Sequence, residues 1–444
     1  MANYLIKNAS LVNEGVIFAS DVLITDSFIE KIDININTSL RVTEIDAEGK
    51  YLIPGIIDDQ VHFREPGLIH KATIATEAKA AVAGGVTSYM EMPNTKPPAT
   101  SLALLEQKYE IAKHTSLANY SFYMGTTNTN ADEVLSINPK DICGIKIFMG
   151  SSTGDMLVEN THALEKIFGN APCIIAIHSE DDGVVKQHLQ QYLEAGTPLN
   201  ASHHPLIRNV KACYDKTKFA ITLAQKYGTK LHVLHISTLD ELEFFGNEVA
   251  LTQKKITAEV CVHHLWYSSD DYATLGNLIK CNPAIKDTKH KEALFTALLH
   301  DKLDVIATDH APHTWDEKCK PYLDAPSGLP LVQHGINIML QYYHQNKITL
   351  PKIVEKMCHN PAILFDIHRR GYLREGYYAD MALIDIEHPT KVTKDNIHYK
   401  CGWSPLEGHT FRGQVTHTFV SGHLAYENDK FYDDRQGMRL VFER

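Results

Sequence analysis

The segment Ile53-Pro54-Gly55-Ile56-Ile57-Asp58-Asp59-Gln60-Val61-His62-Phe63-Arg64 begins as an apolar run and ends in a dense group of polar residues. A continuous apolar run of this kind is typical of a strand that is buried on both faces, as the strands of parallel sheets are. The polar residues stand at its carboxyl end, which is where parallel α/β folds place their binding sites. The same pattern recurs along the chain.

Seven further segments repeat this pattern, and helix-period stretches separate most of them. The eight expected strands are residues 53–62, 86–92, 120–125, 144–149, 173–178, 231–236, 256–263 and 305–308. The helical stretches include residues 74–83, 102–114, 210–227 and 289–299. Eight strand–helix units over about 300 residues predict an α/β fold of the (β/α)8 TIM-barrel type.

The two ends of the chain have a different texture, in which short strands alternate with turns. These expected strands are residues 4–6, 15–18, 22–24 and 28–32 at the start, and 382–385, 416–420 and 423–426 near the end. Neither group is large enough to form a stable domain alone. We therefore expect a small β domain built from residues 1–53 plus 370–444, attached to a barrel formed by residues 54–369.

Composition excludes several classes of protein. The 444 residues include 43 Lys plus Arg and 54 Asp plus Glu, which gives a formal net charge of −11. This acidic balance argues against a nucleic-acid partner. No apolar run approaches the roughly 20 residues of a membrane span, and the start of the chain lacks the pattern of a signal peptide. We expect a cytoplasmic protein with no membrane partner. The eight Cys are scattered, which favours reduced thiols over a zinc ribbon.

Polar residues follow or end nearly every expected strand, so a barrel would gather them at one mouth. A lone buried His is more often a hydrogen-bonded core residue than a ligand, and Asp309 alone could cap a helix. Lys146 is harder to explain in this way, because a buried ammonium group is costly unless it is paired or modified. As a set at one end of eight strands, these residues predict an active site. The set comprises Asp58 to Arg64, Asn94, Lys146, His178 to Asp181, His232, His235, His263, His264, Asp309 and His310.

The motifs closely resemble those of dihydroorotases, which are cyclic amidohydrolases of the amidohydrolase superfamily. The resemblance covers nearly the whole chain, in the order that the family shows. The matching segments are residues 58–67, 92–95, 235–238, 258–265, 307–313, 360–362, 376–381 and 400–405.

The resemblance implies a zinc-dependent hydrolase that interconverts dihydroorotate and N-carbamoyl-L-aspartate in pyrimidine (UMP) biosynthesis. It implies two zinc ions at the mouth. His178 and His235 would bind one ion, His62 and Asp309 would bind the other, and Lys146 would bridge them as a carbamate. Asp309 would also be the catalytic general acid and base.

The same resemblance implies a set of substrate contacts. Arg64 and Asn94 would hold the substrate carboxylate, since a guanidinium group can bind a carboxylate through two parallel hydrogen bonds. Asn282 and His313 would make further contacts with the substrate. A core or supporting position is expected for His264. A homodimer is expected from the family likeness alone.

Two positions depart from the family pattern. Gln60 stands where the family has the first His of a His-x-His pair, and a carboxamide oxygen is a poorer zinc ligand than an imidazole nitrogen. We therefore expect two zinc ions, with the ion beside Gln60 weakly bound and a single ion as the alternative. Lys286 stands where a typical member has Arg.

Two other functions stay open at this point. An allantoinase-like or hydantoinase-like enzyme would share the metal chemistry without needing a charged group such as Arg64 for a substrate carboxylate. A non-catalytic dihydroorotase-like subunit could instead serve as a scaffold for aspartate transcarbamoylase, and Gln60 gives that alternative some support. Such a relic would be expected to lose several ligands together, whereas Lys146, His178, His235 and Asp309 are all present.

Overall fold

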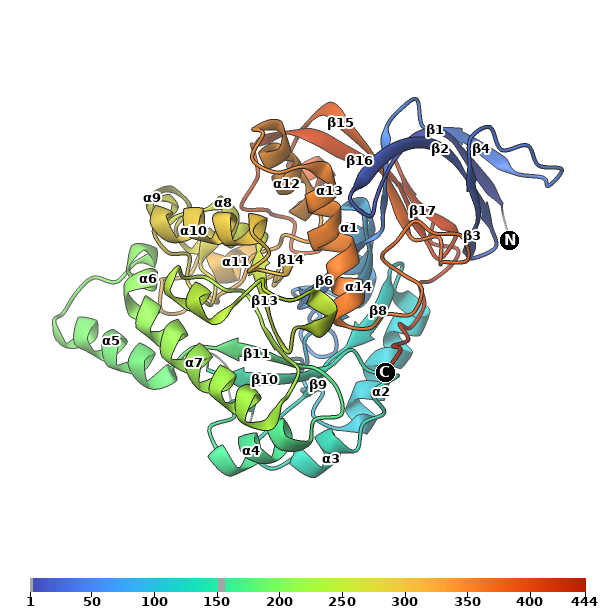
Figure 1. Ribbon diagram of the computed structural model, residues 1–444. Helices are drawn as coiled ribbons and strands as arrows, with labels where there is room; N and C mark the ends of the chain where they lie inside the picture. The colour runs from blue at the N-terminus through green and yellow to red at the C-terminus, as the bar shows by residue number, and fades with distance from the viewer. Residues whose placement is uncertain (1–2, 151–155) are drawn as a thin grey trace.

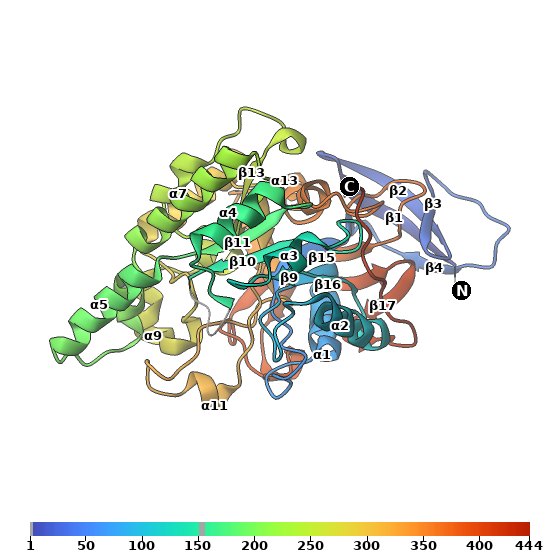
Figure 2. The ribbon, with the colours of Figure 1, turned by 90° about the horizontal axis from the view of Figure 1, so that it is seen from below.

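The computed structural model describes residues 3–150 and 156–444. Figure 1 shows a helix-rich body beside a smaller β region, in which strands from the start of the chain (blue) lie near strands from its end (orange and red). Figure 2 shows from below that helices surround the inner strands of the body. Among helices of the described residues, none has both the length and the apolar character that a membrane span requires.

The body is a barrel of parallel strands that form two hydrogen-bonded groups. The first group is β6 (Ile56–Val61), β7 (Val86–Glu91) and β8 (Asn119–Phe122), and the second is β9 (Met124–Gly125), β10 (Ile145–Met149), β11 (Ile175–Ser179), β12 (Leu231–Val233), β13 (Ile256–Cys261) and β14 (Val305–Ala307). β8 and β9 together are the third expected strand, interrupted at Tyr123. The ring closes at Val61, which pairs in parallel with His310, and the His62 amide donates to the His310 carbonyl at 2.7 Å. The predicted fold class is therefore confirmed.

Helices connect the strands and cover the outside of the barrel. They are α1 (Ile74–Ala83), α2 (Leu102–Thr115), α3 (Ala131–Leu135), α4 (Thr161–Asn170), α5 (Asp182–Glu194), α6 (His204–Ile207), α7 (Val210–Tyr227), α8 (Val262–Trp266), α9 (Tyr272–Leu275), α10 (Thr288–Leu299), α11 (Trp315–Lys318), α12 (Gly335–His344), α13 (Leu350–Val354) and α14 (Asn360–Leu364). Shorter helical segments are η2 (Ala201–His203), η3 (Asp240–Phe244), η4 (Leu251–Gln253), η5 (Ser269–Asp271), η6 (Gly276–Ile279), η7 (Glu355–His359) and η8 (Lys394–Asn396).

Local sequence sets where the main helices begin and end. The Thr73 side chain accepts a hydrogen bond from the Thr76 amide at the start of α1, and Asn209 does the same for the Ala212 amide at the start of α7. These side chains satisfy amides that have no partner within the helix. α7 ends at Tyr227, and the next residue, Gly228, caps it with a φ of 70°, which suits a residue without a side chain.

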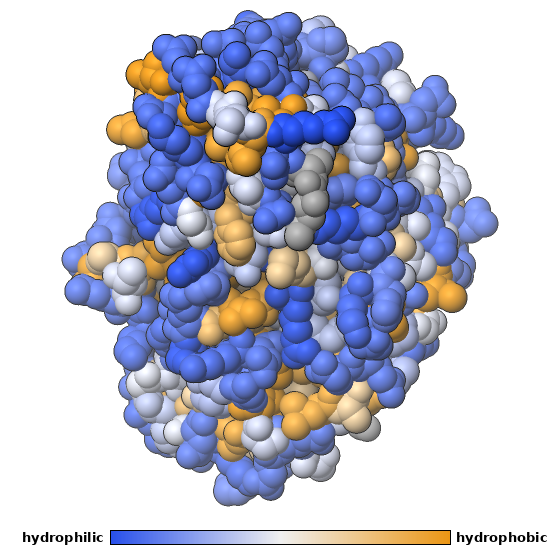
Figure 3. Space-filling model, turned by 90° about the vertical axis from the view of Figure 1, so that its right-hand side faces the viewer, coloured by the Kyte–Doolittle hydropathy of each residue, from blue (hydrophilic) through white to orange (hydrophobic). Residues whose placement is uncertain are grey.

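The second part of the molecule is a sheet that joins both ends of the chain. Its order is β18-β17-β16-β15-β5-β1-β2-β3, with β4 paired to β1. The strands are β1 (Tyr4–Asn13), β2 (Val16–Thr25), β3 (Phe28–Asp33), β4 (Thr43–Asp46), β5 (Tyr51–Pro54), β15 (Met381–Lys391), β16 (Thr410–Val420), β17 (His423–Glu427) and β18 (Lys430–Phe431). β5 and β15 pair antiparallel, which links the two ends of the chain. Figure 3 shows the molecule from this side as mostly hydrophilic, with scattered hydrophobic groups.

Two details of this sheet differ from the sequence interpretation or extend it. The sequence predicts two strands at residues 15–18 and 22–24, but residues 16–18 and 22–24 lie in the single strand β2, because its pairing with β1 continues through a register shift. The last residues leave the sheet: the Leu440 amide donates to the Tyr120 carbonyl at 2.9 Å, and the Phe442 amide donates to the Lys140 carbonyl at 3.1 Å. The domain limits at 53/54 and 369/370 stay a prediction.

Candidate active site

A polar cavity of about 90 Å³ lies at the carboxyl ends of the barrel strands. It is lined by Gln60, His62, Arg64, Asn94, Lys146, Phe148, His178, His235, Asn282, Asp309, Ala311, Ser327 and Gly328. All the metal-ligand residues expected from the sequence are in this lining, together with Arg64, Asn94 and Asn282. His313 is outside the lining but contacts Arg64. The structure thus brings the expected site residues into one place.

One half of the cavity is built by β10, β11 and β12. Nδ1 of His178 lies 2.9 Å from Nε2 of His235, and Nε2 of His178 donates to the Glu180 carboxylate at 2.9 Å. Because the Glu180 bond uses the Nε2 proton, the neutral His178 ring presents an Nδ1 lone pair to His235. Burial lowers the pKa of His178, and that of His235 falls well below its usual value for the same reason. Both rings are therefore set up as neutral ligands.

Glu180 supports His178, a role that the sequence analysis does not assign to it. Arg208 donates to the Glu180 carboxylate at 2.6 Å. Burial raises the pKa of Glu180, but Arg208 and His178 outweigh this effect and bring it to about 2. The carboxylate is therefore ionised and fixes the orientation of His178. The alternation of a strand could have indicated Glu180, since residues two apart point to the same face, but Arg208 lies 28 positions away.

Lys146 stands in the same half, on β10, with 1% of its surface exposed. Its Nζ has no hydrogen-bond partner among the described residues and lies 4.7 Å from the centre of the Phe148 ring. Burial lowers the pKa of Lys146 to about 7. A buried amine without a partner is unfavourable as an ammonium group. Its surroundings fit a lysine that is converted to a carbamate and binds metal.

The other half of the cavity is built from the ends of β6 and β14. Nε2 of His62 lies 3.1 Å from Oδ1 of Asp309, and Nδ1 of His62 lies 2.8 Å from Oδ1 of Asn94. The Asn94 oxygen accepts the Nδ1 proton, so a neutral His62 directs a lone pair at the Asp309 carboxylate. Two acceptors at this distance need a proton or a cation between them. This pair therefore also fits a metal site.

In this half of the cavity, Gln60 acts as a hydrogen-bond donor and not as a third metal ligand. Its Nε2 donates to Oδ1 of Asp309 at 3.2 Å, and its Oε1 accepts a weak hydrogen bond from the Cys261 thiol at 3.8 Å. Burial raises the pKa of Asp309, but the His62 contact outweighs this effect and the net shift is downward. Asp309 is therefore an ionised carboxylate that accepts a hydrogen bond from Gln60 and faces His62.

Three site residues have a backbone conformation that favours glycine. The φ angles of Arg64, His235 and Asp309 are 69°, 39° and 46°. Residues other than glycine adopt this region at a cost of about 1–3 kcal/mol and persist there when their surroundings impose it. Each stands immediately beyond a barrel strand, where the chain turns and the side chain meets the cavity.

Arg64 supplies the cationic side of the cavity. Its Nε donates to the Pro312 carbonyl at 3.0 Å, and its Nη2 lies 3.0 Å from Nε2 of His313. Lys71 contacts the other ring nitrogen of His313 at 2.9 Å. Burial lowers the pKa of Arg64 to about 10, which still leaves the guanidinium group charged at neutral pH. His313 thus holds Arg64 in position, a contact that the sequence interpretation did not include.

The remaining predicted residues lie around the rim. Oδ1 of Asn282 lies 3.1 Å from Nε2 of His204. Ser327 and Gly328 also line the cavity, although neither is among the predicted site residues. Gly328 has a φ of 142°, and a Cβ atom there would lie 2.4 Å from the Ala311 carbonyl oxygen. Only glycine fits this close approach of two loops.

His264 lies outside the cavity lining, in line with the supporting position expected for it. With His263 and Cys281 it forms a buried group whose potential ligand atoms lie within 4.8 Å of one another. Nε2 of His264 lies 3.1 Å from the Pro283 carbonyl oxygen, and the Cys281 thiol donates to the same oxygen at 3.3 Å. One backbone carbonyl thus already binds two members of the group.

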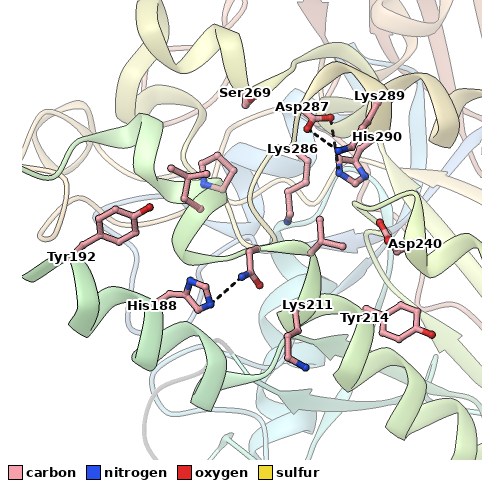
Figure 4. A pocket seen from close by; sticks show the side chains of 14 residues that line it. His188, Tyr192, Lys211, Tyr214, Asp240, Ser269, Lys286, Asp287, Lys289 and His290 are labelled. Atoms are coloured by element: carbon pink, nitrogen blue, oxygen red, sulfur yellow. Dashed lines mark hydrogen bonds and ion pairs between the residues drawn. The ribbon is translucent and has the colours of Figure 1, made fainter. Parts of the chain in front are cut away.

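A larger cavity, of about 760 Å³, lies elsewhere, and none of the predicted site residues is in its lining. Its lining comes from α5, α6, α7 and the segment around residues 284–290, and Figure 4 shows these side chains around an open space. Lys286 is part of this lining and donates to the Ala284 carbonyl at 2.9 Å and to Ser237 at 3.3 Å. The Lys286 amine thus makes its hydrogen bonds to neighbouring groups of the protein.

Comparisons with known proteins identify the family of this chain. The model of the amidohydrolase family matches residues 51–425. A protein named dihydroorotase from Carboxydothermus hydrogenoformans is 33% identical over 434 residues, which cover 95% of this chain and 98% of that protein. Another from Halobacterium salinarum is 30% identical over 390 residues, or 87% of this chain and 89% of that protein.

Solved structures show a likeness of fold. An L-hydantoinase (dihydropyrimidinase) from Arthrobacter aurescens has a TM-score of 0.92 and 24% sequence identity, covering 99% of this chain and all of that chain. A dihydropyrimidinase from Brevibacillus agri has a TM-score of 0.88 and 22% identity, covering 97% of this chain and 96% of that chain. At these identities the likeness supports the barrel and the attached β domain, but not a substrate.

Proposed function

The chain belongs to the amidohydrolase family, and we propose that this metal-dependent hydrolase of cyclic amides is a zinc-dependent dihydroorotase. It would catalyse the reversible hydrolysis of dihydroorotate to N-carbamoyl-L-aspartate in pyrimidine biosynthesis. One observation carries this proposal: a single cavity is lined by a set of potential metal ligands and by the guanidinium group of Arg64. Dihydroorotate offers both a cyclic amide for the metals and a carboxylate for Arg64.

The residues that would hold the metals follow from the two halves of the cavity. We propose that His178 and His235 bind one zinc ion, that His62 and Asp309 bind the other, and that a carbamate on Lys146 bridges them. Bound zinc lowers the pKa of water and polarises a carbonyl group, so that a resistant amide carbon becomes open to attack.

The side chains of the chain itself supply proton transfer and orientation. Asp309 is ionised and would accept the proton of the attacking water and deliver it to the leaving nitrogen, as a general base and then a general acid. Gln60 and His62 hold its carboxylate in place. Asn94 orients His62 through the 2.8 Å contact, and we propose that it contacts substrate as well.

Arg64 would select the substrate by its charge. Pro312 and His313 occupy its Nε and Nη2 atoms, which fixes the plane of the guanidinium group at the edge of the cavity. A planar, pre-positioned guanidinium group binds a carboxylate with good geometry at little entropic cost. Asn282 and His313 would complete the substrate contacts. A cytoplasmic location and a homodimer remain predictions.

A substrate comparison tests the proposal. The full chain, loaded with zinc in the presence of bicarbonate, should open dihydroorotate at least about 100-fold faster, by kcat/KM, than dihydrouracil, which has the same ring without the carboxylate. Hydantoin and allantoin serve as further uncharged substrates. Equal rates with and without the carboxylate would reject dihydroorotase in favour of a hydantoinase-like or allantoinase-like enzyme. Tight zinc binding without turnover of any of these substrates would support the scaffold alternative.

A further inference from the structure

A second group of potential metal ligands lies inside the barrel, outside the cavity lining described above. It consists of Asp59 on β6, His232 on β12 and Glu259 on β13, and each has 0% of its surface exposed. One ligand atom from each lies within 4.8 Å of the others. Asp59 precedes the proposed ligand His62 along the chain, and His232 precedes the proposed ligand His235. The group therefore sits deeper in the barrel than the mouth.

The atoms that face one another in this group have only one another as partners. Among the described residues, neither carboxylate oxygen of Asp59, nor Oε2 of Glu259, nor Nε2 of His232 forms a hydrogen bond of regular geometry, although Nε2 of His232 lies within ion-pair distance of both carboxylates. The second oxygen of Glu259 is satisfied, because it accepts from the His235 amide at 3.1 Å and from the Cys261 thiol at 3.1 Å. Buried polar atoms are nearly always satisfied in proteins. Several buried polar atoms that meet at one point without regular hydrogen bonds fit a cation that they would share.

The other side of the His232 ring fixes which nitrogen is available. Nδ1 of His232 lies 2.9 Å from the Thr257 hydroxyl oxygen, and that hydroxyl donates to the Leu231 carbonyl at 3.3 Å. Since the Thr257 proton is used, its oxygen accepts the proton of His232 Nδ1. In its neutral form His232 presents a lone pair at Nε2. Burial lowers the pKa of His232, but Asp59 and Glu259 outweigh this effect and raise it to about 9, so a proton at Nε2 would stand where a cation is not bound. Metal-binding histidines are commonly held by such a hydrogen bond at the other ring nitrogen.

The spacing of the atoms fits a small cation. Nε2 of His232 lies 3.2 Å from an Asp59 oxygen and 3.8 Å from a Glu259 oxygen. Zinc binds nitrogen and oxygen at about 2.0–2.2 Å in a tetrahedral arrangement, which places neighbouring ligands about 3.3–3.5 Å apart. A divalent cation would also balance the two carboxylates, whose burial without compensation is costly.

We propose that Asp59, His232 and Glu259 bind a divalent transition-metal ion, of which zinc is the probe, at a third site in the barrel interior. An imidazole ligand favours such a metal over magnesium or calcium. The ion would tie β6, β12 and β13 together. Glu259 would link this site to the mouth, because the same carboxylate accepts from the amide of His235. This inference concerns metal binding and does not depend on which cyclic amide the enzyme opens.

Metal analysis on the full chain tests the third site. In a parent carrying Lys146→Ala and His178→Ala, which removes ligands from the mouth, one zinc per chain should resist dialysis. Adding Glu259→Gln, which keeps the size of the side chain, should remove that zinc. Glu241→Gln is the matched control, because Glu241 is equally buried but accepts from Thr217 and Thr238; zinc content should not change.

Diffraction at the zinc edge gives an answer that does not depend on how the variants fold. Crystals of the zinc-loaded unaltered protein should show an anomalous peak between the side chains of Asp59, His232 and Glu259. The absence of this peak, together with peaks at the mouth, would overturn the proposal and show that protons occupy the group. Zinc content that is the same with and without Glu259→Gln in the folded protein would overturn it equally.

Discussion

The two halves of the cavity mouth place similar residues in different surroundings. In the half built by β10 to β12, two imidazole nitrogens face each other at 2.9 Å and the buried amine of Lys146 has no hydrogen-bond partner. In the half built by β6 and β14, His62 faces Asp309, and Gln60 directs an amide proton at the same carboxylate. The first half has ligand atoms with free lone pairs. In the second half, one carboxylate oxygen of Asp309 already accepts a hydrogen bond from Gln60.

The contacts that orient the histidines also favour stronger metal binding in the half with His178. His178 is oriented by the charged pair of Glu180 and Arg208, while His62 is oriented by the neutral side chain of Asn94. A carboxylate behind a histidine makes that histidine a stronger metal ligand. The two proposed metal positions are therefore not equivalent, although they share one cavity. We expect the half with His178 and His235 to hold its zinc more firmly.

The largest effect is expected from Lys146→Ala, because this change removes the proposed bridge between the halves. Activity should fall by roughly 10³-fold or more, since both metals and the water that they activate depend on the bridge. Zinc content should fall as well, and a small carboxylic acid added to the solution should restore part of both. Activity assays and metal analysis on the same samples measure this.

A buried lysine elsewhere provides the control for that change. Lys356 has 0% of its surface exposed, but its Nζ donates to the Leu303 carbonyl at 2.9 Å. Lys356→Met should lower the melting temperature while zinc content stays normal. If Lys146→Ala retains full zinc and turnover, the bridge does not exist.

The second effect in size is expected from Asp309→Asn. Loss of the proton acceptor should lower kcat by roughly 10²–10⁴-fold, which is the usual range for a general acid or base. Most zinc should stay bound, because the first half and Lys146 are unchanged. Asp304→Asn is the control: Asp304 is also buried, but it pairs with Lys254 at 2.6 Å away from the mouth. Near-normal kcat in Asp309→Asn would contradict the role.

Much of this arrangement could be predicted from sequence because it is encoded locally. Apolar runs that end in polar residues located the eight strands, and the family motifs named the residues that line the cavity. The contacts of Arg208 with Glu180 and of His313 with Arg64 could not be predicted, because they join side chains far apart in the chain. The positions of Ser327 and Gly328 in the cavity lining could not be predicted either, because the close approach of Gly328 to Ala311 depends on how the two loops pack.

The third effect concerns substrate selection rather than either metal. Arg64→Met should lower kcat/KM for dihydroorotate by about 100-fold, mainly through KM, because a charge-assisted hydrogen bond contributes about 1.5–3 kcal/mol. Rates with uncharged dihydrouracil should change little. Lys71→Met is the comparison variant, since Lys71 contacts His313 rather than the cavity lining, and its effect should be smaller. An equal loss for both substrates in Arg64→Met would show that Arg64 supports the fold of the mouth and does not select the carboxylate.

The smallest effect is expected from Gln60→His, which tests the inequality of the two halves directly. An imidazole at this position adds a nitrogen ligand and removes the amide donor from Asp309, so the second half should bind zinc more tightly by about tenfold. Competition with a chelator of known affinity, followed as two separate steps of zinc release, measures each half. Gln60→Met removes the same amide without adding a ligand, and it should not tighten either step. If Gln60→His and Gln60→Met release zinc alike, the residue at position 60 does not set the difference, and the supporting contacts of His178 and His62 must account for it.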